Sequence, residues 1–367
     1  MECRDLEIVP LKQWAGSGDL LVMAGPCSAE SREQILTTAR MLARDPRVRI
    51  FRAGVWKPRT RPNTFEGWGH EALAWIAEAG IETGLLTAVE VGTPQHVEEA
   101  LKHGIKVVWI GARTTVNPFM VKELASAMKG SGLAVMVKNP VNPDPQLWIG
   151  AIERIHQAGI QKLAAIHRGF YFFKKSPWRN APMWEIPIEL KRICPHLPII
   201  TDPSHMSGKA ELIAGIAQKA LDLEMDGLMI EVHPDPPHAF TDSAQQITPD
   251  TLFGILDGLK LRNRLASDFD DTLERLRLEI DKLDQELLEI LARRMNIIDE
   301  IGIYKKNHSI TILQLKRWRQ MLAERMESGT HLGLDASFLT EVLQLVHEES
   351  IRRQQQIMDN GNKNQPA

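Results

Sequence analysis

The chain has 367 residues, 43% apolar and 25% charged, and its 44 basic and 47 acidic residues give a formal net charge of −3. This length predicts two domains, or one large barrel with an appendage. The near-neutral balance excludes a general nucleic-acid binder, and no uncharged apolar run approaches the roughly 18 residues of a membrane span. Three widely separated cysteines (Cys3, Cys27, Cys194) and the absence of a secretion signal predict a cytoplasmic protein without a disulfide framework.

Turn-forming residues divide the sequence into two regions. Of the 21 prolines, 20 lie at or before Pro249, and only four of the 25 glycines lie beyond residue 260. The change falls at a short polar stretch, which is typical of a linker. The sequence therefore predicts a first domain at 1–262, a linker at 263–270, a helical domain at 271–358 and a disordered tail at 359–367.

In the first region, short apolar or β-branched runs alternate with amphipathic stretches. The expected strands are 20–24, 49–55, 84–90, 106–110, 133–137, 162–166, 198–201 and 227–231. The helical stretches between them include 32–43, 70–79, 94–103 and 209–223. Eight strands alternating with helices fit a (β/α)8 TIM barrel, and a doubly wound open sheet is the alternative. Because no Gly-x-Gly-x-x-Gly follows a strand, a dinucleotide-binding fold has little support.

The second region is dominated by helical periodicity. Apolar residues recur at helix spacing from Leu273 to Ile301 without a proline, which predicts one helix of about 36 residues and about 54 Å. A domain of this size is too small to cover such a helix, so we expect its apolar stripe to pack against another chain or a large neighbour. Shorter helices are expected at 312–327 and 335–359, which gives an all-α three-helix domain that dimerises.

Four metal-competent residues lie at the ends of strands that would be neighbours in a closed barrel. Cys27 follows strand one, His205 follows strand seven, Glu231 ends strand eight, and Asp242 lies in the loop beyond. The chemistry of such barrels is found at the carboxyl ends of the strands. One soft and three harder ligands suit a divalent transition metal better than Mg²⁺ or Ca²⁺. For each residue alone, an ordinary buried role is the alternative.

Basic residues end several other strands of the expected barrel. They are Arg52, Lys57, Arg59, Arg113, Lys138 and Arg168. Cations around one mouth repel one another unless anions occupy it, and the arginine fork matches phosphate and carboxylate geometry. A doubly anionic substrate set is our interpretation, and solvated rim charges are the alternative for any single residue.

The first region resembles the 3-deoxy-D-arabino-heptulosonate 7-phosphate (DAHP) synthases, in the compact subgroup without a large N-terminal extension. The similarity covers about residues 15–260 and includes Ala24–Ser28, Lys57–Thr60, Gly111–Thr115, Lys138, Arg168-Gly169, Thr201–His205 and Ile230–His233. The related enzyme that uses arabinose 5-phosphate lacks Lys-Pro-Arg-Thr at this loop and is the weaker match.

This resemblance implies an enzyme that condenses phosphoenolpyruvate with erythrose 4-phosphate. It also implies a divalent metal, for which Mn²⁺ is our first expectation, that acts as a Lewis acid toward the aldehyde. The implied metal ligands are Cys27, His205, Glu231 and Asp242. The implied contacts to phosphoenolpyruvate are Arg52, Lys57, Ala112, Arg113, Lys138 and Arg168, with Glu90 nearby. Arg59 and Thr60 would contact erythrose 4-phosphate. The candidates for proton transfer are Lys57, Glu90 and His233.

The helical region carries cations within its apolar helices. Arg294 and Lys305 are 11 residues apart, close to three turns, and therefore share a helix face. Arg277 points about 100° away and could serve the pocket of a partner helix. A solvated charged face is the alternative for each of them.

This region resembles the all-helical class of chorismate mutase across about residues 268–358. The matching stretches are 277–284, 291–294, 302–305 and 344–354. Those enzymes are intertwined dimers, which implies a homodimer formed through the helical domain. A pocket for chorismate and prephenate would be lined by Arg277 (from the other chain), Arg294, Lys305, Arg317, Ser350 and Gln354. The rearrangement needs clamped carboxylates and a stabilised ether oxygen, and Lys305 and Gln354 would stabilise that oxygen.

Two positions depart from the mutase pattern, since Gln314 and Trp318 replace acidic residues that are usual there. A helical module that dimerises and senses an effector without catalysis is therefore an alternative. For the whole chain, the rival is a non-catalytic phosphosugar-binding barrel tethered to a structural coiled coil. Our regulatory hypothesis is that prephenate or chorismate bound in the helical domain inhibits the barrel.

Overall fold

The computed structural model describes residues 5–16, 18, 20–57, 65–173, 176–261 and 271–359. The chain divides into two compact units, residues 1–264 and 265–367. The expected linker and the residues after 359 lie outside the described part of the chain. The limits predicted for the domains, linker and tail therefore stay predictions.

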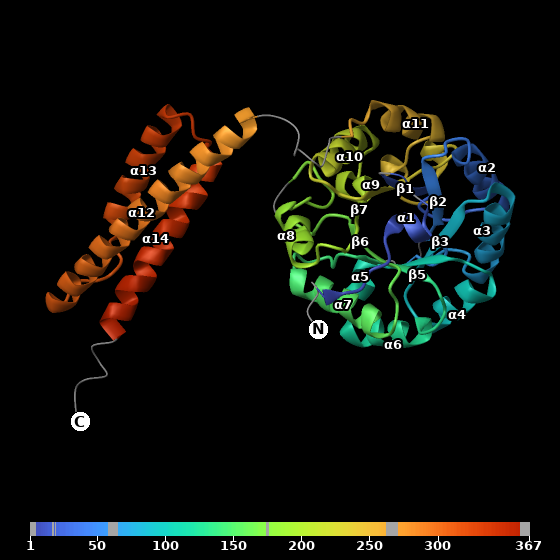
Figure 1. Ribbon diagram of the computed structural model, residues 1–367, viewed down its shortest axis with the longest axis horizontal. Coiled ribbons are helices and arrows are strands. Elements are labelled where there is room, and N and C mark those ends of the chain that lie inside the picture. The colour runs from blue at the N-terminus through green and yellow to red at the C-terminus, as the bar shows by residue number, and fades with distance from the viewer. Residues whose placement is uncertain are drawn as a thin grey trace, which may run out of the picture. The chain divides into compact units, whose positions relative to one another are not determined.

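The first unit is a closed barrel of eight parallel strands in chain order, with helices around it (Figure 1). The strands are β1 (Leu21–Gly25), β2 (Val48–Ala53), β3 (Leu86–Val91), β4 (Val107–Ile110), β5 (Ala134–Lys138), β6 (Leu163–His167), β7 (Ile199–Thr201) and β8 (Gly227–Glu231). Pairing of β1 with β8, from Leu21 beside Gly227 to Gly25 beside Glu231, closes the ring. The predicted (β/α)8 barrel is confirmed, and the doubly wound alternative is wrong.

Helices and short 3₁₀ turns connect the strands. They are α1 (Leu11–Trp14), α2 (Arg32–Leu42), α3 (His70–Thr83), α4 (Pro94–Lys102), α5 (Ala112–Thr115), α6 (Pro118–Met128), α7 (Pro145–Gln157), α8 (Glu185–Ile193), α9 (Pro203–Ser207), η2 (Ala210–Leu212), α10 (Ile213–Asp222), η3 (Pro236–His238), η4 (Ser243–Gln245) and α11 (Pro249–Gly258). Many prolines of this region begin a helix directly after a capping residue, as at Asp144-Pro145, where Asp144 accepts from two backbone N–H groups. This arrangement satisfies free helix donors and fixes φ at the first turn.

The strands separate two apolar layers. One set of side chains fills the barrel interior, among them Met23, Ile50, Trp109 and Met136. The other set packs against the surrounding helices. Both faces of a parallel sheet are therefore covered, which accounts for the nearly continuous apolar strand sequences. Trp14 of α1 packs against the interior layer.

The second unit consists of α12 (Asp271–Asn307), α13 (Leu315–His331) and α14 (Ala336–Asp359). The long helix has 37 residues and continues through Gly302. A Cβ atom at Gly302 would lie 2.9 Å from Cδ1 of Ile357, so the glycine allows α14 to approach α12 closely. The predicted all-α three-helix unit is confirmed.

The apolar stripe of α12 remains largely exposed within its own unit. Leu276, Leu283 and Leu287 are 44%, 62% and 54% exposed. Their spacing places them on one helix face. The predicted homodimer, which would cover this face, stays a prediction.

Two further expectations concern membranes and cysteines. Among the described residues, no helix is both long and apolar enough to cross a bilayer. Cys27 is free and buried. Cys194, however, is disulfide-bonded, whereas the cysteine pattern predicts no disulfide framework.

Candidate active sites

The predicted metal ligands meet at the carboxyl end of the barrel. Ligand atoms of Cys27, Glu231 and Asp242 all lie within 4.8 Å of one another, and Nε2 of His205 lies 3.6 Å from Oε1 of Glu231. The β1–β8 pairing places Gly25 beside Glu231 and so brings the ends of the barrel sequence together. The four side chains predicted from separate strand ends are therefore neighbours.

Burial and nearby charges set the protonation of this cluster. Burial, followed by the charge of Glu231, raises the pKa of the Cys27 thiol to about 12. Burial opposes ionisation of Glu231, but His205, Arg52 and Lys57 outweigh it and hold its pKa below the usual value. Burial lowers the pKa of His205, which favours its neutral form. A soft sulfur, a neutral imidazole and two carboxylates fit a divalent transition metal, which would displace the thiol proton.

Two cations, buried Arg52 and half-buried Lys57, lie directly beside this cluster. Nη1 of Arg52 donates to Oε1 of Glu231 at 2.8 Å, and its guanidinium lies 4.8 Å from the centre of the Trp109 ring. Nε of Arg52 is buried and has no partner among the described residues. Lys57 Nζ donates to the carbonyl of Cys27 at 2.8 Å and lies 3.0 Å from its sulfur. Burial lowers the pKa of Lys57, but Cys27 and Glu231 outweigh burial and raise it, so the amine is charged.

Lys138 and Arg168 form a second cationic part of the mouth. Nζ of Lys138, at the end of β5, lies 3.0 Å from Oδ2 of Asp202. Arg168 follows β6 and donates to Oδ1 of Asn180 at 2.7 Å. Burial lowers the pKa of Arg168 to about 10, so the residue is still a cation at neutral pH. The charges of Arg113 and Glu90 also act on it.

The remaining candidates of the barrel occupy different surroundings. Oε2 of Glu90 accepts from the Trp109 indole at 2.8 Å. Nδ1 of His233 accepts from a backbone N–H at 3.0 Å, and its Nε2 lies 3.3 Å from Glu30. Proton transfer by His233 therefore requires one of these contacts to break. Ala112 begins α5, directly after β4, whereas the candidates Arg59 and Thr60 lie outside the described residues.

Sequence reasoning missed residues that hold the ligands in place. Oδ2 of Asp202 lies 2.8 Å from Nδ1 of His205, which leaves Nε2 directed at Glu231. Arg179 donates to Oδ1 of Asp242 at 2.9 Å, and Gln245 donates to Oε2 of Glu231 at 2.6 Å. The Asp-Pro pair after strand seven is a signal that could have identified Asp202. No periodic pattern points to Arg179, which lies in the loop between β6 and α8.

In the helical unit, three predicted residues meet between α12 and α14. Nη1 of Arg294 donates to Oγ of Ser350 at 2.7 Å. Nε2 of Gln354 donates to the carbonyl of Ser350 at 3.2 Å. Oε1 of Gln354 is buried and has no partner among the described residues. Lys305 donates to the carbonyl of Ile312 at 2.6 Å, and burial lowers its pKa.

Two predicted mutase residues lie outside this group. Arg277 is exposed, and the 17 residues that separate it from Arg294 on the same helix correspond to about 25 Å. Arg317 is also exposed. Trp318 stacks on His347 with 3.6 Å between ring centres and 12° between planes. An aromatic stack therefore occupies a position where the mutase pattern has an acidic residue.

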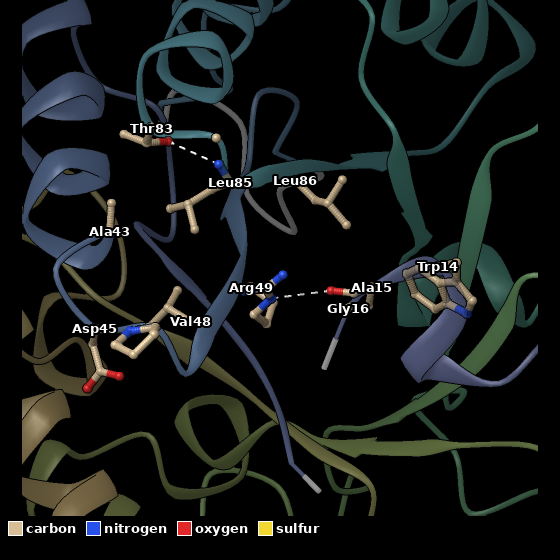
Figure 2. Close-up of a pocket in the computed structure, with 12 residues that line it drawn as sticks. Trp14, Ala15, Gly16, Ala43, Asp45, Val48, Arg49, Thr83, Leu85 and Leu86 are labelled. Atoms are coloured by element: carbon tan, nitrogen blue, oxygen red, sulfur yellow. Dashed lines mark hydrogen bonds between the residues drawn. The ribbon is translucent and has the colours of Figure 1, made fainter. Parts of the chain in front are cut away.

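A separate pocket of about 350 Å³ lies at the opposite end of the barrel, where β2 and β3 begin (Figure 2). Trp14, Arg49 and Leu85 are among the residues that line it. None of the predicted site residues is in its lining. This pocket is therefore distinct from the candidate site at the carboxyl ends.

The structure is a (β/α)8 barrel. At the carboxyl ends of its strands, a candidate metal-binding cluster lies beside basic side chains that could bind anions. The chain belongs to the DAHP synthetase I family, whose model matches residues 7–262. Proteins of this family are generally metal-dependent. Residues 276–355 match the family Chorismate mutase type II. Together, the two matches support the prediction of a bifunctional shikimate-pathway enzyme.

Several known proteins are similar to the barrel region. Phospho-2-dehydro-3-deoxyheptonate aldolase of Thermotoga maritima is 30% identical over 232 residues, which are 63% of this chain and 66% of that protein. The chain thus spans slightly less than two thirds of that relative. The crystal structure of the Thermotoga DAHP synthase gives a TM-score of 0.59 at 27% identity, over 65% of this chain and 67% of that one. 2-Dehydro-3-deoxyphosphooctonate aldolase of Koribacter versatilis is 27% identical over an alignment of 277 residues, and the match covers 68% of this chain and 93% of that protein.

Proposed function

We propose that the barrel condenses phosphoenolpyruvate with erythrose 4-phosphate to DAHP and phosphate, and that the helical unit converts chorismate to prephenate. The observation that carries the first activity is the convergence of Cys27, Glu231 and Asp242 within 4.8 Å, next to buried Arg52 and half-buried Lys57. A phosphosugar-binding barrel without catalysis does not require a thiol, an imidazole and carboxylates at one point.

Cys27, His205, Glu231 and Asp242 would hold a divalent metal, with Mn²⁺ as our first expectation. When bound, the metal supplies Lewis acidity toward the aldehyde oxygen of erythrose 4-phosphate. Asp202 would support the site, because its carboxylate lies 2.8 Å from Nδ1 of the His205 ring.

The cations of the mouth would bind and orient phosphoenolpyruvate. Lys138 and Arg168, with Arg113 nearby, are placed to neutralise its phosphate and carboxylate. Carbon 3 of the enol then attacks the aldehyde carbon, water adds to carbon 2, and phosphate leaves. Charged Lys57 is the leading candidate to give a proton to the aldehyde oxygen, with Glu90 and His233 as the other candidates. Arg59 and Thr60 would contact erythrose 4-phosphate.

The helical pocket would bind chorismate through Arg294, Ser350, Arg317 and the Arg277 of a second chain. The rearrangement needs no general acid or base. It needs bound carboxylates and hydrogen-bond donors at the breaking ether oxygen, which Lys305 and Gln354 would supply. The exposed apolar stripe of α12 and the distance of Arg277 from Arg294 support a homodimer.

A helical module without catalysis is the second candidate, because Trp318 stacks on His347 where an acidic residue is usual. Chorismate loss measured with wild type and with Arg294→Ala separates the two. We expect turnover that depends on Arg294. Absence of turnover in wild type supports the non-catalytic module, and turnover that survives in Arg294→Ala contradicts the proposed pocket.

Both proposed activities can be tested in one sample of the full chain. We expect chelation to abolish synthase activity, Mn²⁺ to restore it, and mutase activity to be unchanged. Synthase turnover that survives complete chelation would contradict the proposed metal site. We further propose a cytoplasmic enzyme whose barrel is inhibited by prephenate or chorismate through the helical unit. Equal inhibition after deletion of residues 263–367 would contradict this regulation.

A further inference from the structure

Glu30 is a buried carboxylate at the barrel mouth that none of the proposed roles uses. The residue is 9% exposed. Its Oε1 accepts from the backbone N–H of Phe240 at 2.8 Å and from the hydroxyl of Ser28 at 3.2 Å. Its Oε2 lies 3.3 Å from Nε2 of His233. Nδ1 of His233 already accepts a hydrogen bond from the N–H of Asp235. Nε2 therefore carries the ring proton and donates a hydrogen bond to Glu30.

The partners of Glu30 are chain neighbours of two proposed metal ligands. Ser28 follows Cys27, and Phe240 is two residues before Asp242. The Ser28 hydroxyl also lies 2.8 Å from Oγ1 of Thr241, the residue directly before Asp242. One carboxylate therefore fastens the loop after β1 to the loop after β8, although the two are about 210 residues apart in sequence.

The same residue also holds a third loop. The carbonyl of Glu30 accepts from the indole N–H of Trp68, between β2 and α3, at 2.9 Å. Phe65, in the same loop, packs edge-on against Phe240 with 5.5 Å between ring centres. Glu30 thus joins the loops that follow β1, β2 and β8.

The backbone conformation of Asp242 depends on support from the residues around it. Asp242 has φ 51° and ψ 36°, which is the left-handed region that non-glycine residues rarely adopt. Such a conformation persists where the surroundings hold it in place. Phe240 and Thr241 directly precede Asp242. Phe240 is held by its hydrogen bond to Glu30, and Thr241 is held by its contact with Ser28.

A second clamp is independent of Glu30. Oε1 of Gln246 accepts from the backbone N–H of Cys27 at 2.9 Å, and its Nε2 donates to the carbonyl of Thr241 at 2.8 Å. Removal of Glu30 therefore leaves other links between the two loops, namely the two hydrogen bonds of Gln246 and the contact of Ser28 with Thr241. We expect a variant at Glu30 to fold, with looser placement of the ligands.

We propose that Glu30 is a positioning residue that sets the separation of Cys27 from Asp242, and through it the affinity of the barrel for a divalent metal. This inference rests on the proposed function, because it takes the four-residue cluster as the metal site. Glu30 is not among the proposed metal ligands or substrate contacts. It acts through Ser28, Phe240 and Thr241.

The test compares Glu30→Ala and Glu30→Gln with Glu33→Gln in the full-length protein after removal of metal. Glu33 lies exposed in the first turn of α2 and is a matched control. Binding of Co²⁺ is followed by the thiolate-to-cobalt absorbance, which reports Cys27 directly and does not depend on turnover. We expect Glu30→Ala to bind Co²⁺ 10- to 100-fold more weakly, in the range of other residues that support metal ligands. Glu30→Gln keeps one acceptor and should lose less, and Glu33→Gln should match wild type.

Thermal unfolding of the same samples checks that each variant is folded. If Glu30→Ala does not fold, Glu30→Gln and Ser28→Ala provide the test, because Ser28→Ala removes the hydroxyl that contacts both Glu30 and Thr241. Wild-type affinity and absorbance in the folded variants would overturn the positioning role. A wild-type protein without the thiolate-to-cobalt band would instead overturn the proposed metal site, and the inference with it.

Discussion

Acidification should destabilise the barrel through one buried histidine, His167. Its side chain is fully buried at the end of β6, next to the rings of Trp148, Phe170 and Trp184. Nε2 donates to the carbonyl of Pro182 at 2.7 Å, and Nδ1 is buried without a partner among the described residues. Burial lowers the pKa of His167 from 6.5 to about 3. The folded barrel therefore holds the ring neutral.

The size of the effect follows from the two pKa values. Below pH 6.5 the unfolded chain binds a proton at this ring and the folded chain does not, so the free energy of unfolding decreases as the pH falls. Each pH unit below 6.5 corresponds to about 1.4 kcal/mol until the folded pKa is reached. Between pH 7.5 and pH 5, His167 should thus cost the barrel about 2 kcal/mol.

Urea unfolding followed by tryptophan fluorescence measures this quantity, since eight of the nine tryptophans lie in the barrel region. The comparison is between wild type and His167→Gln at pH 7.5 and pH 5. The variant can be less stable at both pH values, but its loss on acidification should be about 2 kcal/mol smaller than that of wild type. Equal losses in the two proteins would refute the reasoning.

Three further predictions concern the proposed activities and the assembly. Arg168→Lys removes the guanidinium fork at the cationic mouth, so the KM for phosphoenolpyruvate should rise at least about tenfold; steady-state kinetics with an unchanged KM would contradict this role. Arg294→Ala should lower mutase kcat/KM by about 100-fold or more and leave synthase turnover intact, and assays of both activities give the result. Leu283→Glu places a charge on the exposed stripe of α12 and should convert the proposed dimer to a monomer in light scattering; an unchanged mass would argue against assembly through this face.

Ring closure explains why the candidate metal site could be predicted from the sequence. Cys27 and Glu231 lie at the carboxyl ends of the first and last strands, and in a closed parallel barrel those strands must be neighbours. Similarly, the 11-residue spacing of Arg294 and Lys305 fixes their common face on a straight helix. Periodic structure converts position in the sequence into position in space.

The residues that support the site could not be found in this way. Arg179 and Glu30 lie in connecting loops, where no repeat relates sequence position to direction. Their partners, Asp242 and Phe240, are also loop residues, so each contact depends on two irregular paths. The stack of Trp318 on His347 depends on how α13 meets α14, which the periodicity of one helix does not specify.

The pairing of β1 with β8 has a consequence for the order of events during synthesis. Cys27 is among the first residues of the barrel to leave the ribosome, whereas Glu231 and Asp242 are among the last. A nascent chain therefore cannot assemble the candidate metal-binding cluster until almost the whole barrel has emerged. An ion held by this cluster could not template early folding steps, and a chain truncated before β8 would have a lone thiol with no carboxylate from the far end to join it.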